Sequence, residues 1–146
     1  MDDVYYMKQA IIEAEKAFDK NEVPVGAVIT SRERIIARAH NMTETLNDVS
    51  AHAEIQAITS ASNFLGSKYL NDCTIYVTLE PCGMCAGALA WSQISRIVFG
   101  CYDQKKGFHI YKPSPLHPKT IVTSGVMDKE CSTLLNEFFK QKRDLG

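Results

Sequence analysis

The sequence lacks several features that would place it in a special class of protein. No run of about 18 apolar residues occurs, so the chain offers no candidate for an ordinary membrane-spanning helix. Residues 1–4 are acidic where a secretory signal peptide needs a basic segment, so we expect a soluble, cytoplasmic protein without a membrane partner. Internal repeats are also missing. The 146 residues, 45% of them hydrophobic, favour a single domain spanning residues 1–146.

A large net charge is lacking as well. The formal net charge of −1 excludes a global attraction to nucleic acid or to an anionic membrane. The charge is nevertheless uneven: residues 1–80 hold 7 Lys and Arg against 12 Asp and Glu, whereas residues 81–146 hold 9 against 5. The halves therefore carry −5 and +4. A nucleic-acid surface would belong to the second half, although ordinary solvated surface explains the same pattern.

Hydrophobic periodicity predicts alternating helices and strands. Helical spacing covers residues 3–20, 52–65, 82–92 and 128–143, and apolar or β-branched runs predict strands at 23–30, 34–39, 74–79, 94–100 and 120–123. The first two strands form a hairpin, and Gly26 indicates a close approach by another backbone. Asp128 is expected to cap the last helix. The later alternation of strand and helix predicts parallel pairings, with helices covering both faces of one sheet.

Two segments have little periodicity and read as loops. Residues 40–51 are polar and lead into the second helix. Residues 101–119 contain three prolines and form a loop of the length that often carries function.

A cluster of possible metal ligands is the most informative feature. The five cysteines are odd in number and include a close pair, so metal binding or a thiol role is favoured over a disulfide framework. His52 together with Cys82 and Cys85 supplies three ligands, one short of a closed tetrahedral zinc site. The fourth position would be left to water. The acid Glu54 follows His52 by two residues.

Both halves of this cluster lie where a predicted helix begins. Side chains two residues apart on a helix point about 200° apart, so His52 and Glu54 can converge only on a target beyond the helix end. Two helix N-termini meeting there would favour thiolates through their dipoles.

The cysteine pair alone leaves other interpretations open. A Cys-x-x-Cys pair is also compatible with a redox centre or with half of a structural zinc site. A closed structural site would need a fourth ligand such as Cys73 or Cys101.

Four stretches together resemble the cytidine deaminase superfamily, and more closely the bacterial tRNA-specific adenosine deaminases. They are Val-Pro-Val-Gly-Ala-Val at 23–28, His-Ala-Glu-Ile at 52–55, Thr-Leu-Glu-Pro-Cys-Gly-Met-Cys-Ala-Gly-Ala at 78–88 and Arg-Ile-Val-Phe-Gly at 96–100. The similarity continues through residues 103–107, 116–118 and 137–143, so it covers nearly the whole chain. It implies an α/β fold, a three-layer α/β/α sandwich around a central mixed sheet of about five strands.

The resemblance also implies roles for individual residues. His52, Cys82 and Cys85 would hold one Zn²⁺ per chain, with water or hydroxide in the fourth position, and Glu54 would be the catalytic proton shuttle. The family pattern places substrate contacts at Asn41, Ala53, Asp103, Lys105 and Phe139. Three of them have an ordinary alternative: Asn41 suits a turn, Phe139 lies on the apolar stripe of the last helix, and Lys105 suits plain surface.

The activity implied is hydrolytic deamination of adenosine to inosine at the wobble position of a tRNA anticodon, by a homodimer that binds the anticodon loop. One alternative is a deaminase of a free base or nucleoside of the guanine or cytosine type. Residues 108–111, Phe-His-Ile-Tyr, keep it open, because they are bulkier than the small residues that many relatives carry there. Another is a non-enzymatic zinc-stabilised RNA-binding module, which would have no need of Glu54.

Overall fold

A mixed sheet organises the protein, whose computed structural model describes residues 1–145. The helices are α1 (Asp3–Asp19), α2 (Ala53–Leu65), α3 (Gly83–Ser92), α4 (Asp128–Leu145) and the short 3₁₀ helix η1 (Phe108–Ile110). The strands are β1 (Gly26–Ser31), β2 (Arg34–His40), β3 (Cys73–Leu79), β4 (Arg96–Cys101) and β5 (Ile121–Thr123). The predicted elements are therefore present, with shifts of a few residues at their ends.

The strands lie in the order β2-β1-β3-β4-β5. β1 pairs antiparallel with both β2 and β3, while β3, β4 and β5 run parallel. The prediction of parallel pairing at every strand–helix–strand step was wrong at the first step. The crossover through α2 does bring β3 back parallel to β2, but β1 lies between them and takes up the hydrogen bonds of β3. The helical crossover sets the direction of β3 relative to β2, and the sequence pattern leaves the choice of neighbouring strand open.

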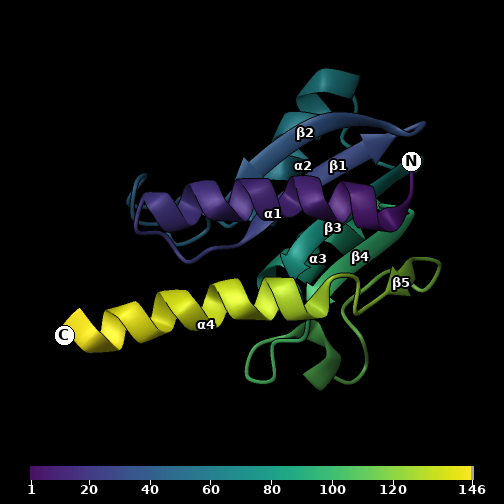
Figure 1. Ribbon diagram of the computed structural model, residues 1–146. Helices are drawn as coiled ribbons and strands as arrows, with labels where there is room; N and C mark the ends of the chain where they lie inside the picture. Colours follow the sequence, from purple (N-terminus) through teal and green to yellow (C-terminus); the bar gives the residue numbers. More distant parts are fainter. Residues whose placement is uncertain (146) are drawn as a thin grey trace.

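Helices cover both faces of this sheet, which confirms the three-layer sandwich (Figure 1). On one face α1 packs against β1 and β3, α4 packs against β4, and the two helices contact each other. On the other face α2 packs against β1 and β2 and contacts α3. No helix within residues 1–145 combines the length and the apolar character needed to cross a membrane.

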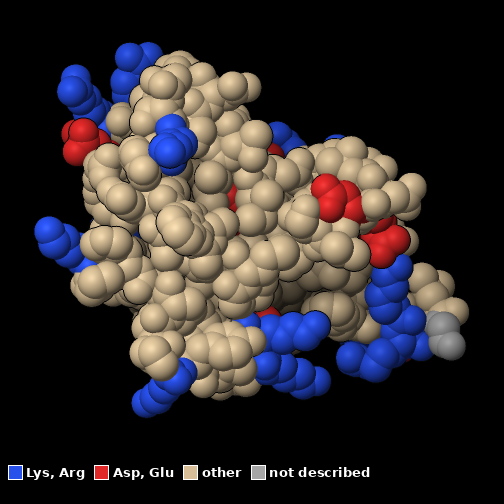
Figure 2. Space-filling model, turned by 180° about the vertical axis from the view of Figure 1, so that it is seen from behind, with Lys and Arg blue, Asp and Glu red and all other residues tan. Residues whose placement is uncertain are grey.

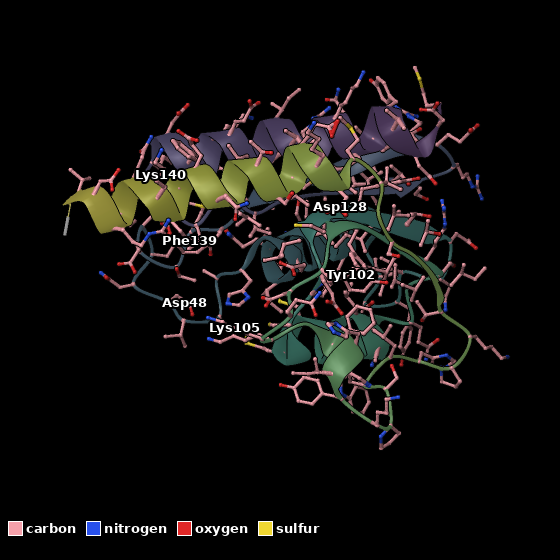
Figure 3. The ribbon with its side chains drawn as sticks, turned by 60° about the horizontal axis from the view of Figure 1, so that its bottom comes forward. Asp48, Tyr102, Lys105, Asp128, Phe139 and Lys140 are labelled. Carbon is pink, nitrogen blue, oxygen red and sulfur yellow. The ribbon has the colours of Figure 1, made fainter. Side chains whose placement is uncertain are left out.

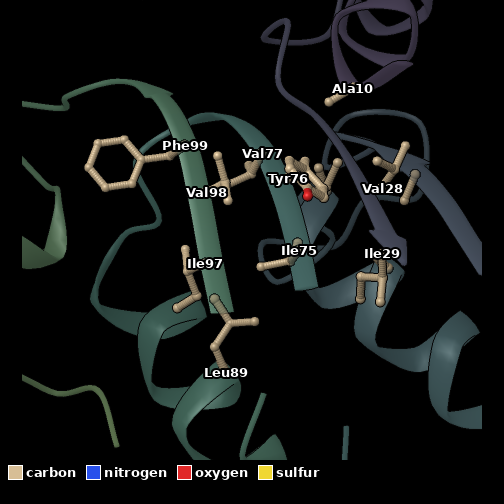
Figure 4. Packing of buried hydrophobic residues seen from close by; sticks show 14 of the residues in the cluster. Ala10, Val28, Ile29, Ile75, Tyr76, Val77, Leu89, Ile97, Val98 and Phe99 are labelled. Carbon is tan, nitrogen blue, oxygen red and sulfur yellow. The ribbon is translucent and has the colours of Figure 1, made fainter. Parts of the chain in front are cut away.

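The core fills both sides of the central strands. Ile29, Ile75 and Ile97 are paired across β1, β3 and β4 and form a row on the face that carries Leu89 of α3 (Figure 4). On the opposite face α1 lies so close to β1 that a Cβ on Gly26 would overlap the α1 backbone, as the sequence predicted. This tight contact fixes the segment just before β1, which borders the site described below.

Two element ends differ from the sequence prediction. The strand expected from residue 23 begins only at Gly26, because Val25 donates its backbone N–H to Val23 in a tight turn instead of to a neighbouring strand. Asp128, expected to precede the last helix as its cap, is the first residue of α4.

Candidate active site

The N-terminal ends of α2 and α3 lie close together on the face of the sheet that these two helices cover. His52 is the residue just before α2 and Cys82 is the residue just before α3, each with an extended backbone that aims its side chain past the helix end. Cys85 lies in the first turn of α3 and is fully buried. The positive ends of both helix dipoles therefore face the same small volume, where they favour thiolates and other anions.

The three side chains are spaced as zinc ligands are. Nδ1 of His52 lies 3.5 Å from Sγ of Cys85 and 3.7 Å from Sγ of Cys82. Zinc bonds of about 2.3 Å to sulfur and about 2.0–2.1 Å to nitrogen, arranged tetrahedrally, separate two such ligands by roughly 3.6 Å. Within residues 1–145 no fourth His, Cys, Asp or Glu joins this group. The donor set thus fits a zinc ion with one position open to solvent or substrate.

The two cysteines that a closed structural site could have used as a fourth ligand have other environments. Cys101 is buried and its thiol donates to the backbone carbonyl of Thr78. Cys73 lies at the first residue of β3, at the opposite end of that strand from Cys82.

The two cysteines of the group differ in their acidity. A hydrogen bond from the thiol of Cys85, opposed by burial and aided by His52, lowers the pKa of Cys82 to about 4. The pKa of Cys85 is raised, because its thiol donates to Cys82 and because it is buried. The same contact with Cys82 raises the pKa of His52. The lowered pKa of Cys82 favours its thiolate, which is the form in which cysteine binds a metal.

Glu54 faces the same volume without joining the group. It lies in the first turn of α2 and its side chain is buried. Burial raises the pKa of this carboxyl to about 7. A carboxyl with that pKa exchanges a proton at neutral pH, which is what a general acid and base requires.

A cavity of about 210 Å³ opens beside these residues. Its volume lies below the ~300–1,000 Å³ of pockets that hold drug-sized ligands, so it suits a single ring system. Apolar side chains form part of its wall and polar groups the rest. The lining residues are Val23, Val25, Asn41, Thr43, His52, Ala53, Glu54, Leu79, Glu80, Cys82, Asp103 and Lys106.

Three of the five predicted substrate contacts line this cavity. Asn41 is buried at the end of β2, with its amide near Val23 and Thr43 through hydrogen bonds of 3.4 Å. Ala53 is the first residue of α2 and is fully buried. Asp103 lines the cavity as well, although its carboxylate accepts the backbone N–H groups of residues 105 and 106 at 3.0 Å.

The other two predicted contacts lie outside the cavity. Lys105 is exposed, and its neighbour Lys106 lines the cavity in its place. Phe139 is 45% exposed on α4, while Phe138 beside it is buried, so Phe139 is not a core residue. Figure 3 shows Phe139, Lys105 and Asp48 at the same end of the molecule.

Basic side chains border this end. Lys140, Lys142 and Arg143 lie at the C-terminal end of α4, and Lys105 and Lys106 lie in the loop that follows β4. Figure 2 shows basic groups on either side of a hollow in this face. Of these basic residues, Lys106 lines the cavity and Lys105 precedes it in the chain.

Sequence reasoning missed two buried carboxylates near the cavity. Glu22 accepts the backbone N–H groups of Glu44 and Thr45 and the hydroxyl of Thr45, at 2.6–3.0 Å. Glu80, at the end of β3, lines the cavity and bonds to the loop that follows β4. The position of Glu80 could have indicated a role in the site, because it is a charged residue between an apolar strand and the Cys-x-x-Cys pair.

Fold and site together define a class of protein. An α/β/α sandwich with an open His, Cys and Cys group and a nearby glutamate that is not a ligand is the arrangement of the zinc-dependent nucleobase deaminases. Comparison with known families agrees: the MafB19-like deaminase model matches residues 1–143. The tRNA-specific adenosine deaminase of Bacillus subtilis (strain 168) is 44% identical over 146 residues, covering 97% of this chain and 91% of that protein. The chain therefore belongs to the MafB19-like deaminase family and, within it, to the tRNA-specific adenosine deaminases.

Solved structures extend the comparison. A structure from a study of A-to-I editing by tRNA:A34 deaminases superposes with a TM-score of 0.84 and 40% identity, covering 90% of this chain and 99% of that one. A guanine deaminase from Bacillus subtilis superposes with a TM-score of 0.67 and 36% identity, covering 70% of this chain and 66% of that one. The likeness to the tRNA deaminase is closer and extends further along both chains.

Proposed function

We propose that this protein is a zinc-dependent hydrolase that converts adenosine to inosine at the wobble position of a tRNA anticodon. The observation that carries the proposal is the spacing of His52, Cys82 and Cys85 around one point that the buried Glu54 also faces. The family membership supports the substrate, because the Bacillus subtilis relative that matches along nearly the whole chain is a tRNA-specific adenosine deaminase.

His52, through Nδ1, and the thiolates of Cys82 and Cys85 would hold one zinc ion per chain. Zinc in such a site acts as a Lewis acid that lowers the pKa of water to about 7. Because the protein supplies only three ligands, the fourth coordination position of the zinc ion would be open to water or substrate.

Glu54 moves the protons of the reaction. The hydrolysis adds water across C6 of adenine and releases the amino group as ammonia. Glu54 accepts one proton from the attacking water and delivers it to N1 of the ring. It then takes the remaining proton of the new hydroxyl group on C6 and passes it to the departing amine, so that ammonia leaves, C6 becomes a carbonyl and Glu54 returns to its starting state. Its pKa of about 7 suits both directions of transfer at neutral pH. Burial that excludes bulk water keeps this carboxyl at that pKa.

The cavity wall would recognise the base. Asn41 offers an amide, which presents both a donor and an acceptor to a purine edge, and the backbone of Ala53 lies beside it. Asp103 in the cavity wall and Lys105 and Phe139 outside it would contact the RNA that flanks the flipped base, with Phe139 as a stacking platform. The exposure of Phe139 and the nearby basic groups support this assignment.

We further propose that residues 1–146 form one deaminase domain, that the protein acts as a homodimer and that it works in the cytoplasm. A second copy would extend the surface available to the RNA beyond one cavity.

A deaminase of a free base or nucleoside of the guanine or cytosine type is the competing function, and the likeness to a guanine deaminase favours it. The bulky residues 108–111 do not strengthen it. None of them lines the cavity, and Phe108 is buried against Phe99. Mass spectrometry of an anticodon stem-loop incubated with the protein separates the two functions, because only the tRNA activity produces inosine within the RNA.

A further inference from the structure

A buried carboxylate outside the catalytic group holds the loop that follows β4. Glu80 is the residue between β3 and Pro81, and its side chain is fully buried. It accepts the backbone N–H of Asp103 at 3.1 Å, the backbone N–H of His109 at 2.8 Å and Nδ1 of His109 at 2.8 Å. One side chain thus bonds to both ends of the segment 103–109.

His109 supplies the only side-chain donor among these three bonds. With its hydrogen on Nδ1, the ring donates to the carboxyl oxygens of Glu80, at 2.8 Å from Oε1 and 2.9 Å from Oε2. The ring also meets Tyr102 edge to face, with 5.3 Å between the centroids. His109 is therefore held in one orientation from two sides although 35% of its side chain is exposed.

The segment that these bonds hold is part of the cavity wall. Asp103 and Lys106 both line the cavity, and Asp103 is tied to Gly107 through a backbone bond of 2.9 Å. Gly107 lies against the carboxylate of Glu80, where a Cβ would overlap Oε1. Phe108 donates its backbone N–H to Pro81, next to the predicted ligand Cys82. The position of this wall relative to the zinc ligands thus depends on Glu80 and its partners.

We propose that Glu80 and His109 form a clamp, in which His109 is a positioning residue that fixes residues 103–107 as one wall of the cavity and so sets affinity for the RNA substrate. The inference deepens the proposed function and rests on it for the identity of the substrate. His109 acts through Glu80 and Asp103 and touches no reacting atom. Losing its ring should therefore weaken substrate binding more than it slows the chemical step.

Three variants test the clamp in the zinc-loaded protein. His109→Ala removes the Nδ1 donor, whereas His109→Asn keeps an N–H donor at a similar reach from Cβ. Ser114→Ala is the matched control, because it removes one side-chain hydrogen bond within the same long loop, to Leu116, away from the cavity. Zinc content and thermal unfolding establish that each variant is folded.

The first readout is independent of activity. Lys105 and Lys106 are exposed, so trypsin reports how often their segment opens. We expect native-state cleavage after these residues to be about tenfold faster in His109→Ala, because this variant loses the side-chain hydrogen bond to Glu80. His109→Asn and Ser114→Ala should be cleaved as slowly as the parent protein. Equal cleavage of His109→Ala and the parent overturns the clamp.

The second readout is kinetic. With an anticodon stem-loop as substrate, His109→Ala should raise KM about tenfold and leave kcat within about twofold, and His109→Asn should restore KM. A fall in kcat equal to the rise in KM, or a failure of His109→Asn to restore KM, contradicts a positioning role. An inactive parent protein would refute the proposed function, and the trypsin comparison would still decide whether the clamp exists.

Discussion

Nδ1 of His52 lies 3.5 Å from Sγ of Cys85, although 33 positions separate the two residues in the chain. The contact exists because α2 and α3 lie on the same face of the sheet and begin at the same end of it. The site is therefore a product of the sheet topology, and its ligands should respond to substitution as a unit.

Zinc binding is predicted to require all three residues of the group. His52→Ala or Cys85→Ala should reduce the bound zinc from one ion per chain to a small fraction, because two ligands hold the metal poorly. Metal analysis after dialysis checks this. Cys101→Ser is the control, since its hydroxyl can keep the bond to the carbonyl of Thr78. Loss of zinc from Cys101→Ser would instead indicate a closed site with Cys101 as a ligand.

Glu54→Gln should abolish activity and spare the metal. The amide cannot carry the proton, and general acid–base catalysis is worth about 10²–10⁴-fold in rate. The variant should still bind one zinc ion, measured by metal analysis beside the deamination rate. Glu15→Gln, an exposed carboxylate on α1, should behave like the parent protein. A Glu54→Gln protein of normal activity would show that the proton shuttle is another group.

The elements were predictable because their signals are local. The residues at 52, 54, 82 and 85 could be placed at helix starts from spacing alone. The spatial order of the strands could not be, because the insertion of β1 between β2 and β3 depends on long-range pairing. The role of Glu80 was also hidden, since its partners Asp103 and His109 lie 23 and 29 positions away in a loop without periodicity. Phe139 was ambiguous because a helical stripe does not tell which edge residue remains exposed.

Phe139 is predicted to contribute to RNA binding without contributing much to folding. Its ring is 45% exposed, and base–aromatic stacking is worth about 1–3 kcal/mol per base. Phe139→Ala should raise the Kd for an anticodon stem-loop about tenfold, measured by fluorescence anisotropy. Phe64→Ala removes a ring that is 66% exposed at the far end of α2 and serves as control. If Phe139→Ala and Phe64→Ala bind the stem-loop with equal affinity, Phe139 does not stack on an RNA base.

The ion pair between Asp3 and Arg96 should make stability depend on pH in the acid range. Hydrogen bonds from the guanidinium lower the pKa of Asp3 below its unfolded value of about 3.9. A carboxyl with a lowered folded-state pKa stabilises the protein fully above the unfolded pKa, and that contribution is lost as pH falls through the folded pKa.

Asp3→Asn should therefore have a lower free energy of unfolding than the parent protein at pH 7. The difference should be about 1 kcal/mol or less, because the ion pair is partly exposed, and it should shrink below about pH 4. Urea unfolding across this range checks the prediction, with the exposed Asp19→Asn as control. A difference that grows as pH falls would contradict the assignment.

Product analysis with competing substrates tests directly whether the protein deaminates the wobble adenosine of a tRNA anticodon. The zinc-loaded protein is incubated with an anticodon stem-loop that carries adenosine at the wobble position, and separately with guanine, adenine and cytidine, and the products are identified by mass spectrometry. A stem-loop with guanosine at that position controls for other changes to the RNA. The account predicts inosine at the wobble position and no turnover of the free compounds. Turnover of a free base or nucleoside while the RNA stays unchanged would contradict it.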